Sequence, residues 1–241
     1  MNIQEITEKV YSNDPFICTY DNLLTDEECN HFINLSKGNL QKALVSENKT
    51  GIVSNGRSGL NMWINHKHDY ITENVGKRIA DIVKLPLENA EKFQLIYYDI
   101  SQEYRNHYDS WEHNYSEKAL RCMKYGGARL ITALCYLNDV EQGGGTHITK
   151  KNITIEPIKG RLLVFHNTYS NTNIRHELSE HAGLPVIKGE KYAFNLWFKE
   201  CKHDLLYEKF NPNYYLPLKT KIKDKYEKIN DFIILNREKQ F

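Results

Sequence analysis

Residues 129–137 read Arg-Leu-Ile-Thr-Ala-Leu-Cys-Tyr-Leu, a run of aliphatic, aromatic and β-branched side chains without proline or glycine. Side chains of this kind favour extended strands, and short runs separated by turn residues are typical of antiparallel sheets. Clusters of Gly, Asn and Pro separate it from similar runs at Gln94–Ile100, Ile153–Glu156, Arg161–Phe165 and Tyr192–Phe198. The pattern predicts a β-sandwich or barrel.

The first 90 residues have a helical pattern instead. Thr25-Asp26-Glu27-Glu28 is a capping box that can satisfy the free amides of a helix start, and it predicts a helix over about 25–36. Apolar residues at helical spacing from Ile71 to Ile82 predict a second helix, and the polar segment Ser46 to Ser58 predicts a loop between the two. We therefore expect an α+β fold, a double-stranded β-helix or jelly roll that starts near residue 93 and is buttressed by N-terminal helices.

The length of 241 residues suits one large domain with an appendage. We expect a catalytic domain over residues 1–200 and a C-terminal extension over 201–241, whose role the sequence does not indicate. The extension has a helical pattern over 221–236. Five cysteines at wide spacings, with no Cys-x-x-Cys pair, predict reduced thiols.

Charge and hydropathy exclude several partners. The 32 Lys and Arg residues nearly balance 31 Asp and Glu residues, so the chain lacks the broad positive field that nucleic-acid binding requires. The N-terminal sequence Met-Asn-Ile-Gln-Glu-Ile-Thr-Glu has no basic and apolar signal pattern, and no run approaches the roughly 18 apolar residues of a membrane span. We expect an intracellular protein with neither a nucleic-acid nor a membrane partner.

A possible metal site follows the first of the predicted strands. In extended backbone, residues i and i+2 point to the same side, so His107 and Asp109 can converge on one ion. A single His-x-Asp is common by chance, but His181 can supply a second imidazole. Two imidazoles and one carboxylate form the facial triad of iron(II) oxygenases, which leaves coordination positions open for a chelating 2-oxo acid and O₂.

Lys191 lies ten residues after His181, at the start of the last predicted strand. A buried lysine requires an anion, and the distal carboxylate of 2-oxoglutarate would provide one. Lys191 and Trp197 are six residues apart, so both point to the same face of that strand. This context favours His181 as the ligand over the other histidines in this half of the chain, His113, His147, His166 and His176.

Over roughly residues 15–200 the chain resembles the catalytic domain of prolyl 4-hydroxylases, including their algal, viral and bacterial short forms. The matching segments, in order, are Asp14-Pro15-Phe16 with the Leu-Thr-Asp-Glu-Glu-Cys helix start, Gly56-Arg57-Ser58-Gly59, Tyr98 to Asp109, Gly143-Gly144-Gly145-Thr146, and His181 through Trp197. The order and spacing of these segments together are specific to the family.

The resemblance implies a role for each matching position. The metal ligands would be His107, Asp109 and His181. The 2-oxoglutarate contacts would be Lys191, Tyr98 and Thr146. The peptide contacts would be Tyr104, Arg129, Trp197 and Arg57, and the Ser46–Ser58 loop would close over the peptide. The reaction implied is that of a procollagen-proline 4-dioxygenase, which uses Fe(II), O₂ and 2-oxoglutarate, releases succinate and CO₂, and uses ascorbate as reductant.

Two departures and several alternatives accompany this interpretation. Gly145 replaces a glutamate that is common in the family, and we expect no counterpart of the peptide-binding domain of the animal collagen enzymes. The substrate could instead be a lysyl side chain, a free amino acid or another small molecule, and a non-catalytic metal-binding interaction module is a third hypothesis. Zinc is the alternative metal, but no His-Glu-x-x-His motif supplies its general base. Arg129 could equally form an ion pair at the barrel rim.

Overall fold

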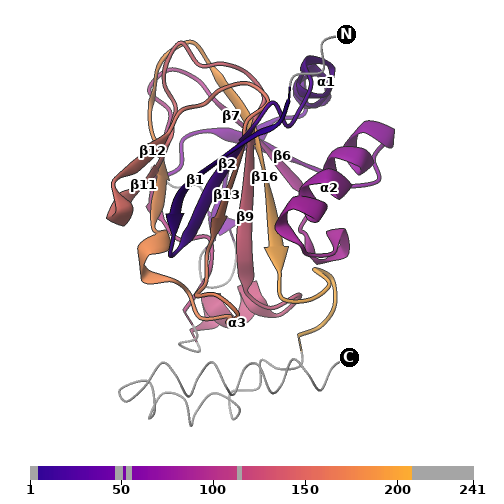
Figure 1. Cartoon of the computed structure of the whole chain (residues 1–241), viewed down its shortest axis with the longest axis vertical. Helices are drawn as coiled ribbons and strands as arrows, with labels where there is room; N and C mark the ends of the chain where they lie inside the picture. The colour runs from indigo at the N-terminus through magenta and orange to yellow at the C-terminus, as the bar shows by residue number, and fades with distance from the viewer. Residues whose placement is uncertain (1–4, 47–50, 53–55, 113–115, 208–241) are drawn as a thin grey trace.

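The computed structural model describes residues 5–46, 51–52, 56–112 and 116–207. An eight-stranded sheet, which we call the main sheet, runs through the middle of the molecule (Figure 1). Its order is β1 (Thr7–Asn13), β2 (Phe16–Asp21), β13 (Leu162–His166), β9 (Arg129–Tyr136), β16 (Lys191–Lys199), β7 (Phe93–Tyr98), β6 (Leu60–Ile64) and β3 (Gln41–Lys42). All neighbouring strands of this sheet are antiparallel.

A four-stranded minor sheet faces the main sheet. Its order is β12 (Ile153–Ile155), β11 (Thr146–Ile148), β14 (His181–Gly183) and β8 (Tyr104–His107). Two further strand pairs are β10 (Gln142–Gly143) with β15 (Val186–Lys188), and β4 (Val45–Ser46) with β5 (Gly51–Ile52). The helices are α1 (Asp26–Ser36), α2 (Tyr70–Val83) and α3 (Glu117–Met123), with short 3-10 turns η1 (Leu87–Asn89), η2 (Thr149–Lys151) and η3 (Glu177–Ser179).

The two faces of the main sheet pack against different layers. In β13, Leu162 and Val164 pack with α1 and α2, whereas Leu163 and Phe165 pack toward the minor sheet. On the helix side, Phe32 of α1 contacts Phe93 and Phe194 at ring-centroid distances of 5.2 Å and 4.8 Å. Figure 1 shows α2 on one side of the main sheet and β11 and β12 on the other. The predicted helical buttress is thus confirmed.

Both predicted N-terminal helices begin and end close to the expected positions. Thr25 caps α1 with the reciprocal bonds of a capping box, since its hydroxyl accepts from the Glu28 amide and the Glu28 carboxylate accepts from the Thr25 amide. Helix α2 ends at Val83, before Pro86, as predicted. All five cysteines are free thiols. The predicted helix over 221–236 lies outside the described residues.

The expectation that strands begin only near residue 93 is wrong. Four strands of the main sheet, β1, β2, β3 and β6, come from the first 64 residues. Strand β1 was missed because it is an edge strand with largely exposed polar side chains, which gives no apolar alternation.

At the C-terminal end of the described residues, Tyr207 is buried, and its hydroxyl donates to Glu200. No helix in the described part is long and apolar enough to cross a membrane.

Candidate active site

Three predicted ligands meet where the minor sheet faces the main sheet. His107 is the last residue of β8 and His181 the first of β14, and these two residues are direct partners in the antiparallel register. Asp109 follows two residues after β8 ends. One candidate ligand atom from each of the three residues lies within 4.8 Å of the others, and no other such cluster occurs among the described residues.

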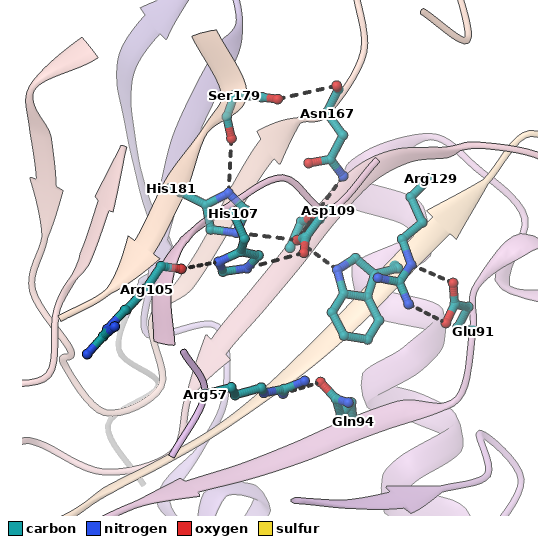
Figure 2. A network of polar contacts seen from close by, with 12 residues as sticks. Arg57, Glu91, Gln94, Arg105, His107, Asp109, Arg129, Asn167, Ser179 and His181 are labelled. Carbon is teal, nitrogen blue, oxygen red and sulfur yellow. Dashed lines mark hydrogen bonds and ion pairs between the residues drawn. The ribbon is translucent and has the colours of Figure 1, made fainter. Parts of the chain in front are cut away.

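The two imidazoles have the same orientation relative to the backbone. His107 Nδ1 hydrogen-bonds to the carbonyl of Arg105 at 2.8 Å, and His181 Nδ1 to the carbonyl of Ser179 at 2.9 Å (Figure 2). A carbonyl only accepts, so each Nδ1 carries the proton and each Nε2 has a free lone pair. Those Nε2 atoms face Asp109, at 3.6 Å from Oδ1 for His107 and 3.5 Å from Oδ2 for His181.

The two oxygens of Asp109 have different surroundings. Oδ2 accepts hydrogen bonds from the Thr132 hydroxyl at 2.7 Å and from the Trp197 indole at 2.8 Å. Asn167 in turn donates to the Thr132 hydroxyl at 2.8 Å. Oδ1 accepts no hydrogen bond from the residues that the structure describes and lies 3.6 Å from His107 Nε2, so it is the oxygen available to a cation. Buried outer-shell bonds of this kind fix ligand orientation.

Burial and neighbouring charges set the protonation of the three groups. Burial favours the neutral acid at Asp109, but the neighbouring His181, His107 and Arg129 together hold its pKa well below the usual range. Burial, followed by the proximity of His107, lowers the pKa of His181 to about 4. At neutral pH the site therefore offers a carboxylate and a neutral imidazole, the forms that bind metals.

Lys191 points into the same pocket from β16 and is only 3% exposed. Its Nζ donates to the carbonyl of Gly144 at 2.6 Å, and no carboxylate of the described residues lies within ion-pair distance. Gly143 and Gly144 both have positive φ, so this turn presents its carbonyl in a backbone conformation that other residues rarely adopt. Burial lowers the pKa of Lys191 to about 7.

The pocket between the three candidate metal ligands, which we call the triad, and Lys191 is lined by most of the other residues predicted to contact cosubstrate or substrate. Tyr98, Thr146, Tyr104 and Trp197 all line it. Tyr98 is the direct partner of Lys191 across β7 and β16, and Thr146 accepts a hydrogen bond of 2.7 Å from Tyr136. The ring of Tyr104 stacks on that of His107 with centroids 3.6 Å apart.

Two predicted substrate contacts lie beside this pocket rather than in its lining. Arg57 is buried and donates to Gln94 at 2.9 Å (Figure 2). Its guanidinium lies over the Tyr104 ring. Arg129 forms a two-pronged ion pair with Glu91, at 2.6 Å and 2.8 Å. It lines a neighbouring groove together with Trp63 and Trp111. The ion pair anticipated for Arg129 is therefore present.

The competing histidines of the described chain are engaged elsewhere. His176 hydrogen-bonds to Asp14 at 2.9 Å, and His147 to Thr154 at 2.9 Å. The ring of His166 packs on Phe16. His113 lies outside the described residues.

The residues present fit a divalent iron ion and 2-oxoglutarate. Two imidazole nitrogens and one carboxylate oxygen can bind an ion from one side, which leaves the other side of the ion open to the pocket. These three atoms are the donor set of the facial triad. The buried ammonium of Lys191 lines the same pocket and lacks an anionic partner within the described chain. A small dicarboxylate that chelates the metal can supply that partner.

Comparison with known proteins agrees with this geometry. The family model described as the 2OG-Fe(II) oxygenase superfamily matches residues 93–199. The chain is 32% identical over 211 residues to Prolyl 4-hydroxylase 5 of Arabidopsis thaliana, an alignment covering 79% of this chain and 70% of that protein. This chain belongs to the prolyl 4-hydroxylase family. The family model places residues 93–199 in a superfamily described as 2OG-Fe(II) oxygenases.

Two further matches describe the extent of the similarity. "Probable prolyl 4-hydroxylase 7" of Arabidopsis thaliana is 32% identical over 203 residues, and the chain spans 62% of that protein, which is less than two thirds of its length. A crystal structure of the viral collagen prolyl hydroxylase from Paramecium Bursaria Chlorella virus-1, in complex with 2OG, has a TM-score of 0.60 and 26% identity. That match covers 75% of this chain and 94% of the viral one.

Sequence reasoning missed the residues that support the site. Thr132 and Asn167 form the hydrogen-bonded chain to Asp109, Tyr136 donates to Thr146, and Glu91 pairs with Arg129. Thr132 is the direct partner of Trp197 across β9 and β16, so strand register could have located it. At Gly145, a Cβ atom would lie 3.0 Å from the carbonyl oxygen of Ile155, so the glycine suits this close approach of β12.

Proposed function

We propose that this protein hydroxylates proline at C4 within a peptide or protein, consuming O₂ and 2-oxoglutarate and releasing succinate and CO₂. The observation that carries the proposal is the shared pocket, in which His107, Asp109 and His181 form an open-sided ligand set and Lys191 presents a buried ammonium without an anion. An open-sided set and a separate anion site are what a chelating cosubstrate requires.

Separate sets of residues would bind the metal and the cosubstrate. Bound iron(II) and 2-oxoglutarate supply, with O₂, an oxidant able to break an unactivated C–H bond. His107 and His181 would bind the ion through Nε2, and Asp109 through Oδ1, because the remaining polar atoms of these side chains are already hydrogen-bonded. Ascorbate, as a reductant that keeps the iron ferrous, belongs to this proposal.

Lys191 would pair with the distal carboxylate of 2-oxoglutarate, and Tyr98 and Thr146 would add hydroxyl contacts. Each of these three side chains lines the pocket, and each is less than 5% exposed. A carboxylate that enters beside Lys191 gives the ammonium the partner that the described chain lacks, and the low dielectric of the site strengthens the pair.

The substrate would approach the open side of the triad past aromatic surfaces. Tyr104 and Trp197 line that side, Trp63 lies 6.1 Å from Trp197 between ring centroids, and Arg57 covers the Tyr104 ring. Flat aromatic faces suit the prolyl ring and the extended polyproline conformation. Arg57 supports the Tyr104 ring from beside the pocket, and its buried Nε has no hydrogen-bond partner among the described residues.

Two facing antiparallel sheets with helices behind one of them support the double-stranded β-helix, or jelly roll, as the fold. We assign residues 1–200 to the catalytic domain and 201–241 to an extension. The contact of Tyr207 with Glu200 supports close packing of the first part of the extension on the domain.

The test is incubation of the purified protein with Fe(II), 2-oxoglutarate, O₂ and a library of proline-containing peptides, followed by mass spectrometry. We expect peptide products heavier by one oxygen atom and an equal amount of succinate. His181→Ala should abolish turnover, whereas His147→Ala, a substitution in the same sheet outside the ligand set, should retain it. Succinate formation stimulated by free proline or lysine but not by peptides would overturn the peptide assignment.

A further inference from the structure

Trp197 contacts the metal ligand set directly, although sequence reasoning placed it only against the substrate. Its indole N–H donates to Asp109 Oδ2 at 2.8 Å, and Thr132 donates to the same oxygen at 2.7 Å. These two bonds decide which carboxylate oxygen remains for the ion. The orientation of the Trp197 ring therefore determines the orientation of the Asp109 carboxylate.

Arg129 fixes that ring from behind. Its guanidinium carbon lies 3.7 Å from the Trp197 ring centroid and 5.0 Å from that of Trp111, so the cation lies against both indoles. Contacts this close between a largely buried guanidinium and an indole face are favourable and directional. Arg129 is thus placed to restrict the indole plane, and with it the direction of the indole N–H.

Glu91 in turn fixes the plane of the guanidinium. Arg129 Nε and Nη2 donate to the two carboxylate oxygens of Glu91 at 2.6 Å and 2.8 Å, and Lys199 Nζ lies 3.9 Å from one of them. Figure 2 shows this chain of contacts from Glu91 through Arg129 toward Asp109. A largely buried ion pair contributes little net stability compared with an apolar pair of equal volume, so stability alone does not account for the pair of Glu91 with Arg129.

We propose that Glu91 and Arg129 are positioning residues that act through the ring of Trp197 to hold the Asp109 carboxylate in its metal-binding orientation. Neither residue lines the pocket around the triad within the described chain. Their influence on the metal would pass through the stacked ring of Trp197 and its hydrogen bond to Asp109. This inference rests on the proposed function, since it requires that Asp109 binds the ion.

The first experiment measures Mn(II) affinity by calorimetry in the wild type and in Arg129→Lys, which keeps the charge but loses the planar, two-pronged contact. Loss of an outer-shell partner weakens metal binding roughly 10- to 100-fold. For this more distant residue we expect about tenfold weaker Mn(II) binding. Glu91→Gln, which leaves the guanidinium without a carboxylate, should give a similar loss and serves as an independent second variant.

Arg161→Lys is the matched control. Arg161 forms the same Nε and Nη2 pair with Asp21, and its side chain is 11% exposed against 15% for Arg129. Arg161 has no contact with the triad residues in the described structure. We expect wild-type Mn(II) affinity in this variant, with a decrease in the urea midpoint similar to that of Arg129→Lys.

A double-mutant cycle tests the route through Trp197. Trp197→Phe keeps an aromatic face but removes the N–H, so Arg129→Lys should weaken Mn(II) binding less than about twofold further in that background. Independent, multiplying losses would overturn the proposal. So would an Arg129→Lys variant with wild-type Mn(II) affinity and a raised KM for peptide, because that result makes Arg129 a substrate contact. A wild type that binds no Mn(II) would instead overturn the proposed function.

Discussion

Replacing Lys191 by methionine should stabilise the metal-free protein while removing most of its affinity for 2-oxoglutarate. Burial lowers the pKa of Lys191 from 10.5 to about 7. A pKa that falls by one on folding corresponds to about 1.4 kcal/mol, so at pH 7 the burial of this unpaired ammonium costs about 5 kcal/mol of folding stability. Methionine fills a similar volume without the charge.

The net gain is smaller than this cost because the substitution also breaks a hydrogen bond. Lys191 Nζ donates to the Gly144 carbonyl, and an orphaned buried acceptor costs about 1 to 3 kcal/mol. We therefore expect Lys191→Met to raise the free energy of unfolding by about 3 kcal/mol at pH 7. The affinity for 2-oxoglutarate should fall more than about 30-fold, as for loss of one member of a buried charge pair.

The sign of the pH dependence gives an independent check. Between pH 7 and 10.5 the unfolded chain binds the lysine proton and the folded, metal-free chain does not, so wild-type stability should rise with pH. The methionine variant should lack this contribution. Urea unfolding at pH 7 and pH 9 measures both effects, and calorimetry with Mn(II) measures 2-oxoglutarate binding.

Lys188→Met, an exposed lysine three residues earlier, is the control and should change stability by less than about 0.5 kcal/mol. A Lys191→Met variant that is less stable than the wild type at pH 7, or that binds 2-oxoglutarate equally well, would refute the reasoning.

Three other perturbations test the surroundings of Lys191. With Mn(II) saturating, the affinity of the wild type for 2-oxoglutarate should fall up to about tenfold per pH unit above pH 7, because binding requires the protonated ammonium of Lys191. An affinity that stays constant from pH 6.5 to 8.5 would argue against the pairing of Lys191 with 2-oxoglutarate. Tyr136→Phe removes the donor to Thr146 and should raise the KM for 2-oxoglutarate about tenfold with little change in kcat; steady-state kinetics with an unchanged KM would exclude Thr146 as a contact. Gly144→Ala forces a side chain onto φ +69°, which costs about 1 to 2 kcal/mol and shifts the carbonyl that binds Lys191, so calorimetry should show weaker 2-oxoglutarate binding. Gly38→Ala, at φ +78° in open space, should cost similar stability in urea but leave that affinity unchanged, and equal losses of affinity in both would contradict the assignment.

The sequence predicted those parts of the fold that carry a strong local pattern. The capping box at Thr25 and the apolar runs of β9, β13 and β16 lie within a residue or two of the observed elements. Strand β1 could not be found in this way, because an exposed edge strand pairs through its backbone and needs no apolar alternation.

In the candidate site, too, the sequence predicted some residues and missed others. His107, Asp109, His181 and Lys191 follow from spacing and family resemblance, because metal and anion binding restrict the residue types at these positions. The supporting contacts depend on which residues face each other across strands, as Thr132 faces Trp197, and on the ion pair between Arg129 and Glu91. Those pairings follow from strand register and packing, which local sequence does not specify.

The most direct test of the central claim is a crystal structure of the protein grown anaerobically with Fe(II) and 2-oxoglutarate. We predict one ion bound by Nε2 of His107, Nε2 of His181 and Oδ1 of Asp109, chelated by 2-oxoglutarate whose far carboxylate contacts Lys191. An ion bound elsewhere, or a 2-oxoglutarate carboxylate remote from the Lys191 ammonium, would contradict the assignment of the site.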